Sequence, residues 1–222
     1  MPDLILSILT ATANLGVFLG WTLAYLLLAR DAHTHKTAGA PLLVLTSMIA
    51  YEVSATMIWP VMKQSLLFGL FEWLWLGIDF FLLSQLWAYA DPKWKHPRYF
   101  LAGFVVLLLS IWCTVTMIHE FGLEDMGVPG VLFGAIISAV FFPFVWKHPH
   151  PNRLSLRAQV ARLIGDICIV ASIWLVFPNG VEGSPNNSFT SALSATMLSC
   201  DVATVLMLYI FQKNSPRLKR RA

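Results

Sequence analysis

The residues best suited to chemistry are five acids that fall inside apolar runs: Glu52, Glu72, Asp79, Asp166 and Asp201. Glu52, Asp79 and Asp201 lie near the middle of predicted membrane spans, and the other two lie nearer span ends. A carboxylate at the centre of a bilayer costs about 2.5–3.5 kcal/mol on insertion scales. We therefore expect these acids to face an interior cavity, where low polarity favours a neutral, proton-carrying carboxyl group.

Helical spacing indicates what each acid could contact within its own span. Arg162 stands one turn before Asp166, so we interpret these two as a structural ion pair near the basic side of the membrane. A buried acid can also bond a hydroxyl or an indole of a neighbouring helix, which is our interpretation of Glu72. Asp79 shares a face with Glu72 and Trp75 and fits either a structural or a functional use.

Aromatic side chains form a second unusual group, since they make up 13% of the chain. Most of them are expected to pack or to form belts at the membrane surface. Trp59 and Trp75 lie on acid-bearing faces, and Tyr51 precedes Glu52. With Asp79 beside them, these aromatic faces could surround a carbocation and stabilise it by cation–π attraction.

The elements that must position these residues follow from the composition. The chain has 222 residues, of which 57% are apolar and 12% are charged, about half of the roughly 25% charged residues usual in soluble domains. This excludes a disordered chain and a nucleic-acid binder, and it disfavours a soluble enzyme. We predict an all-α membrane protein, a single domain over residues 1–222, with seven transmembrane helices at about 4–29, 41–60, 67–90, 98–119, 127–146, 159–178 and 188–211.

The distribution of basic residues supports seven spans and predicts their orientation. With seven spans, fourteen of the fifteen Lys and Arg residues fall on one side, and only Lys63 falls on the other. Cytoplasmic loops carry such an excess of positive charge. We expect an outside or luminal N-terminus and a cytoplasmic C-terminus. The host membrane would be the endoplasmic reticulum in a eukaryote or the inner membrane in a bacterium.

Several classes of membrane protein are excluded or left open by what the spans contain. No lysine lies inside a span, which excludes a retinal Schiff-base protein, and no row of spaced arginines marks a voltage sensor. A small proton-coupled transporter or channel that uses the buried carboxyls remains an alternative, as does a non-catalytic scaffold. Gly16 and Gly20 form a small-xxx-small pattern that is typical of close helix packing.

Two short patterns carry a resemblance to a known family. Tyr51-Glu52 followed by Ile58-Trp59-Pro60 resembles the second span of the integral-membrane terpene cyclases of meroterpenoid and indole-diterpene biosynthesis. Asp201 with Tyr209 resembles the acid-bearing last span of that family, and the segment 162–165 resembles the start of its sixth span. The number of spans, the size and the orientation fit along nearly the whole chain.

The resemblance implies a class II-type cyclisation, in which an acid protonates an epoxide or a terminal alkene of a prenylated substrate. Glu52 and Asp201 correspond to the expected catalytic acids, either with Glu52 as the donor or with the two sharing a proton. The chain lacks the aspartate-rich motif that binds magnesium diphosphate. We therefore expect no diphosphate ionisation, no metal and no cofactor. The expected partners are a small hydrophobic prenylated substrate and the lipid bilayer.

Overall fold

The computed structural model describes residues 2–37, 39–58, 66–89, 97–121, 127–147, 155–176 and 187–214. Within these ranges every element is helical, which confirms the prediction of an all-α chain. The helices are α1 (Pro2–His35), α2 (Leu42–Val53), the π-helical segment η1 (Ser54–Ile58), α3 (Leu66–Tyr89), α4 (Pro97–Phe121), α5 (Gly127–Lys147), α6 (Leu156–Val176) and α7 (Asn187–Asn214).

The helix ends follow local sequence signals. Pro41 occupies the N-cap position of α2, and Pro97 begins α4; proline is tolerated in a first turn because the N–H that it lacks would have no helical partner there. Ser155 caps α6, since its Oγ accepts a hydrogen bond of 3.2 Å from the backbone N–H of Ala158. The predicted span boundary at Pro60 lies outside the described residues.

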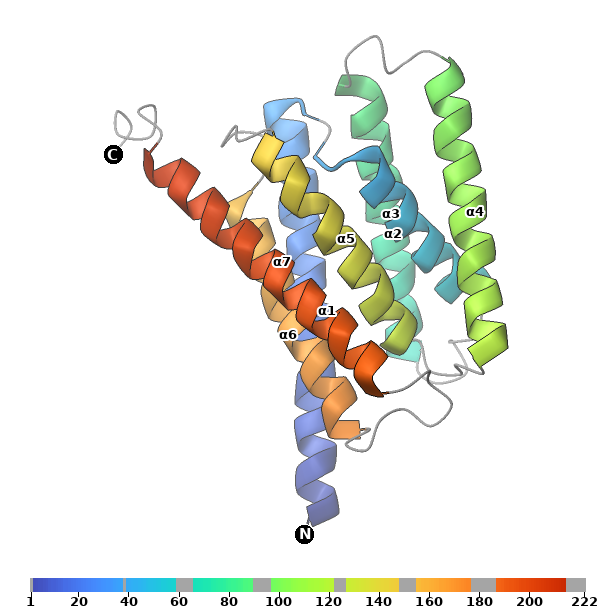
Figure 1. The fold of residues 1–222 in the computed structure, drawn as a ribbon, viewed down its shortest axis with the longest axis vertical. Coiled ribbons are helices and arrows are strands. Elements are labelled where there is room, and N and C mark those ends of the chain that lie inside the picture. Colours follow the sequence, from blue (N-terminus) through green and yellow to red (C-terminus); the bar gives the residue numbers. More distant parts are fainter. Residues whose placement is uncertain are drawn as a thin grey trace.

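Length and composition make four of the helices able to cross a membrane. Their apolar segments are Leu4–His35, Gly69–Tyr89, Leu156–Leu175 and Phe189–Asn214, while α2 with η1, α4 and α5 contribute shorter apolar stretches. The helices run alternately up and down the bundle, and the beginning of α1 and the end of α7 lie at opposite ends of it (Figure 1). α4 lies at the edge of the bundle and packs chiefly on α2.

The most extensive contact between two helices is that of α1 with α6. A Cβ atom added to Gly20 would lie 2.7 Å from the backbone nitrogen of Gly165, so glycine is required for the two backbones to approach this closely. Gly16 likewise faces the side chain of Cys168 on α6. The predicted role of this glycine pair in close packing is confirmed, and the contact places the aromatic face of α1 beside the charged residues of α6.

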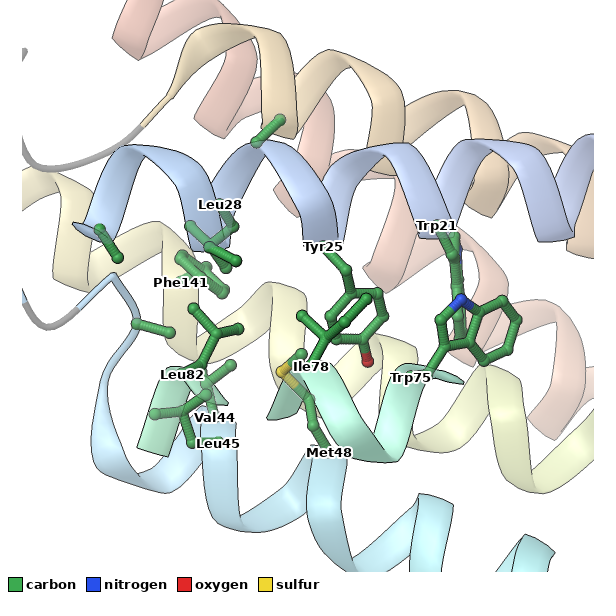
Figure 2. Close-up of a cluster of buried hydrophobic side chains, with 14 of the residues drawn as sticks. Trp21, Tyr25, Leu28, Val44, Leu45, Met48, Trp75, Ile78, Leu82 and Phe141 are labelled. Carbon is green, nitrogen blue, oxygen red and sulfur yellow. The ribbon is translucent and has the colours of Figure 1, made fainter. Parts of the chain in front are cut away.

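The core lies where α1, α2, α3 and α5 meet. Figure 2 shows Trp21, Tyr25 and Leu28 projecting from one face of α1 toward side chains of α2 and α3. Leu45 and Leu82 are completely buried there, and Phe141 of α5 joins the same cluster. This apolar packing surrounds the polar groups described next.

Candidate functional site

Three acids of α2 and α3 lie together in the core, and we call Glu52, Glu72 and Asp79 the carboxyl cluster. Each is at most 1% exposed. Glu72 and Asp79 lie on the buried face of α3, and α2 packs on α3 so that Glu52 interacts electrostatically with both. The π-helical segment η1 begins two residues after Glu52; such irregular turns are frequent at functional sites.

The carboxyl groups of Glu52 and Glu72 approach within hydrogen-bonding reach of each other. Two carboxylates cannot hydrogen-bond to one another, because neither has a proton to donate. The approach is stable only if one of the two carries a proton. Among the described residues neither oxygen of Asp79 has a hydrogen-bond partner, and no arginine or lysine neutralises the cluster.

Tyr25 of α1 joins the carboxyl cluster to the aromatic core. It is 7% exposed and interacts electrostatically with Asp79, Glu52 and Glu72. Its ring stacks on Trp75, with centroids 6.2 Å apart and planes inclined by 19°. In Figure 2 the Tyr25 side chain points from α1 into the space between Ile78 and Trp75.

Trp75 is the centre of an aromatic group and lies between Glu72 and Asp79 on α3. Its ring centroid lies 5.6 Å from that of Trp21, 5.9 Å from that of Phe18 and 6.1 Å from that of Phe71. The indole N–H donates a 2.8 Å hydrogen bond to the hydroxyl of Thr22, which fixes the ring. The arrangement offers several π faces beside groups that can carry protons.

Arg162, Asp166 and Asp201 form a second polar group, which we call the arginine cluster. Asp166 and Asp201 are each 1% exposed. Nη2 of Arg162 forms an ion pair with Oδ1 of Asp201 on α7 and donates a hydrogen bond of 3.1 Å to Oγ of Ser138 on α5. Nε of Arg162 lies 3.7 Å from Oδ2 of Asp166. The guanidinium group therefore links α5, α6 and α7.

Two aromatic residues hold the arginine cluster in place. The indole of Trp21 donates a 2.9 Å hydrogen bond to Oδ1 of Asp166. The guanidinium carbon of Arg162 lies 5.0 Å from the ring centroid of Phe141, a cation–π distance. Both contacts cross between helices, so the cluster is rigidly attached to its surroundings.

A cavity adjoins the arginine cluster and reaches Tyr25, the neighbour of the carboxyl cluster. Arg162, Asp166 and Gln159 line it from α6, and Tyr25 lines it from α1. The rest of its wall is apolar and includes Trp21, Ala24, Leu28, Met48, Ile137 and Phe141. Glu52 and Asp201 are not among the residues that line it.

The comparison with known families decides the class of protein. The sequence model of the Pyr4-like transmembrane terpene cyclases matches residues 3–214. The chain belongs to this family. No curated protein and no solved structure matches the cyclase. Family membership makes the chain an integral membrane enzyme, which decides against the transporter and the scaffold that the sequence left open.

The residues that the sequence singled out lie in different parts of the cyclase. Glu52 and Asp79 belong to the carboxyl cluster, together with Glu72, for which we had expected a hydroxyl or indole partner. Asp201 has Arg162 as its immediate partner, so the two expected catalytic acids have different neighbours. The arginine also lies beside Asp166, as its position in the sequence predicted.

Two of the expected aromatic residues have clear positions. Trp75 is the central ring of the aromatic group. Tyr51 is 6% exposed and packs on Phe133 of α5, with ring centroids 5.7 Å apart. Trp59 lies outside the described residues.

Sequence reasoning missed Tyr25 and Trp21 of the cyclase. Both lie in a predicted span that contains no acid, so the pattern of acids gives no reason to single them out. The signal that could have found them is the spacing of Phe18, Trp21, Tyr25 and Leu28, which places large side chains on one face of α1.

Proposed function

We propose that this cyclase protonates an epoxide or a terminal alkene of a prenylated substrate, with Glu52 as the general acid. The observation that carries the proposal is the approach of the Glu52 and Glu72 carboxyl groups in a core where no described residue supplies a neutralising cation. Such a pair holds a proton inside an apolar, aromatic environment. Protonation of an epoxide oxygen breaks its C–O bond, and the resulting carbocation is attacked by the next alkene.

The aromatic group supplies what the cation then needs. Trp75, Tyr25 and Tyr51 offer π faces that stabilise positive charge, and tight packing excludes the water that would quench it. Asp79 lies beside these rings and adds a compensating carboxyl group. We assign to Asp201, the second expected catalytic carboxyl group, the role of the base; it is held by Arg162, and its Oδ2 has no hydrogen-bond partner among the described residues. It accepts the proton that the final cation releases, so the product is an isomer of the substrate.

We further propose that all seven helices cross the membrane as a single domain of residues 1–222. α4 and α5 have 25 and 21 residues, which corresponds to roughly 37 and 31 Å at 1.5 Å per residue, enough for a hydrocarbon core of about 30 Å. We assign the C-terminus to the cytoplasm, because cytoplasmic loops and tails carry an excess of basic residues. The host membrane is the endoplasmic reticulum in a eukaryote or the inner membrane in a bacterium.

The test is conversion of Glu52 to Gln, which keeps the shape of the side chain and removes the acid. Membranes containing wild type or Glu52→Gln are incubated with farnesyl- and geranylgeranyl-bearing hydroxyaromatic compounds, with and without a terminal epoxide. Mass spectrometry and chromatography then follow a product of equal mass. We expect the rate to fall by about 10²–10⁴-fold, the usual contribution of general acid catalysis.

Asp31→Asn is the matched control, because Asp31 lies near the end of α1 and outside both clusters. It should leave the rate unchanged. If the Glu52→Gln variant cyclises the substrate at the wild-type rate, Glu52 is not the general acid. Detergent-solubilised wild type should remain active without a proton gradient, because a cyclase needs no driving force across the membrane.

A further inference from the structure

The cavity beside the two clusters has one polar side. Gln159, Arg162 and Asp166 lie three and then four residues apart on α6, and therefore on one face of that helix, which is directed into the cavity. Gln159 is 3% exposed and Arg162 has a side chain that is 13% exposed. A buried amide, a guanidinium and the carboxyl group of Asp166 thus adjoin a space whose other described lining residues, apart from Tyr25, are apolar.

The guanidinium of Arg162 is held in place but not saturated. Nη2 is used by Asp201 and Ser138, and the ring of Phe141 lies against the guanidinium. Nη1 and Nε have no hydrogen-bond partner among the described residues, although Asp166 lies 3.7 Å from Nε. Buried donors without acceptors destabilise a protein, so an oxygen-bearing ligand in the cavity would gain the bonds that the chain itself does not supply.

The position of the cavity relative to the carboxyl cluster indicates which end of a bound ligand would point toward the acids. Tyr25 lines the cavity and also interacts with Glu52, Glu72 and Asp79. Apolar residues such as Met48 and Leu28 continue the wall beside it. A molecule with its polar end at Arg162 would therefore extend an apolar chain past Tyr25 toward the acid.

We infer that this cavity is the subsite for the headgroup of the substrate, with Arg162 and Gln159 as its hydrogen-bonding residues. The inference rests on the proposed cyclisation, because the prenylated substrate proposed there has the polar headgroup that this subsite would bind. The ligand class is a ring that carries carboxylate, carbonyl or hydroxyl oxygens. A planar guanidinium matches paired oxygens of this kind better than an ammonium group does.

Binding of unreactive probes tests the subsite separately from catalysis. Both probes carry a fully saturated farnesyl chain; one chain is attached to dihydroxybenzoic acid and the other to an unsubstituted phenyl ring. Dissociation constants are measured with detergent-solubilised full-length protein. We expect wild type to prefer the oxygenated probe by about 10–100-fold, the range for hydrogen bonds to a charged group.

The preference should fall to a few-fold in Arg162→Lys, which keeps the charge but loses the planar donors. Gln159→Leu should lower it several-fold and does not alter a contact of Asp201. The matched control is Arg157→Lys, since Arg157 lies on α6 in an exposed position, and this variant should retain the wild-type preference. If Arg162→Lys does not fold, the decision rests on Gln159→Leu.

Two results would overturn the subsite. One is a preference that neither variant changes, and the other is an equal loss of affinity for both probes, which would indicate a packing role. Failure of the proposed cyclisation is recognised differently, as absence of turnover of the reactive epoxides by wild type that still shows the probe preference. Glu52→Gln should lose turnover and keep that preference.

Discussion

The carboxyl cluster and the arginine cluster are equally buried but differ in the balance of charge. Glu52, Glu72 and Asp79 lie together with no cation from the described part of the chain, whereas Asp166 and Asp201 share Arg162. Ionising all three acids of the carboxyl cluster would place three like charges in an apolar core, at a large cost. In the arginine cluster one guanidinium stands against two carboxyl groups, and it connects three helices.

The difference separates two uses of an acid inside a membrane protein. A carboxyl group paired with arginine is favoured in its charged form and fixed in position, so it can hold helices together or accept a proton. A carboxyl group paired only with other carboxyls must hold a proton and is suited to deliver it. Glu52 and Asp201 would thus contribute to one reaction in different ways.

The largest expected effect is on stability and distinguishes the clusters directly. Arg162→Met leaves two buried carboxyls without their cation, and breaking a buried pair costs about 3–5 kcal/mol. Asp79→Asn removes a carboxyl group that has no cation and should leave stability unchanged or higher. Unfolding in mixed detergent micelles measures both variants, and equal losses in the two would contradict the distinction.

A smaller effect compares the same substitution in the two regions. Trp21→Phe removes a hydrogen bond of 2.9 Å to the carboxylate of Asp166, and bonds to charged groups contribute about 1.5–3 kcal/mol. Trp75→Phe removes a bond of 2.8 Å to the neutral hydroxyl of Thr22, which contributes about 0.6 kcal/mol on average within a membrane. The same unfolding assay should therefore rank Trp21→Phe as the more damaging change; the reverse order would indicate that Asp166 is not charged.

The smallest expected effect is that of Tyr25→Phe on catalysis. The change removes one hydroxyl from the surroundings of Glu52 and keeps the ring that stacks on Trp75. A single hydrogen bond of about 0.5–1.5 kcal/mol corresponds to a two- to tenfold change in rate. Tyr209→Phe serves as the control, because Tyr209 is 52% exposed on α7. Equal rates for the two variants would show that the Tyr25 hydroxyl does not influence catalysis by Glu52.

The helices themselves could be predicted closely from the sequence. Apolar runs of membrane length, interrupted by prolines and charges, leave little freedom in where a helix lies. The buried face of α7 could also be predicted from helical spacing. The residues that share this face are all buried: Ser194, Met197, Asp201, Thr204 and Leu208. Within one helix, the geometry is regular enough for such predictions.

Contacts between helices could not be predicted in the same way. Asp166 lies one turn from Arg162 in the sequence, but its second partner, Trp21, is 145 residues away. Likewise, nothing in the spacing of α2 or α3 indicates that Glu52 meets Glu72. These pairings depend on how the helices rotate and pack against each other, which a single sequence does not encode in any local pattern.

The close packing of α1 against α6 has a consequence for how a hydrophobic substrate reaches the interior of the bundle. A substrate dissolved in the bilayer must pass between two helices to arrive at Tyr25. Where Gly20 meets Gly165 the backbones are in direct contact, so parting them would sacrifice close packing along both helices. We therefore expect the contact between α1 and α6 to stay closed, and the substrate to enter from the lipid between other helices.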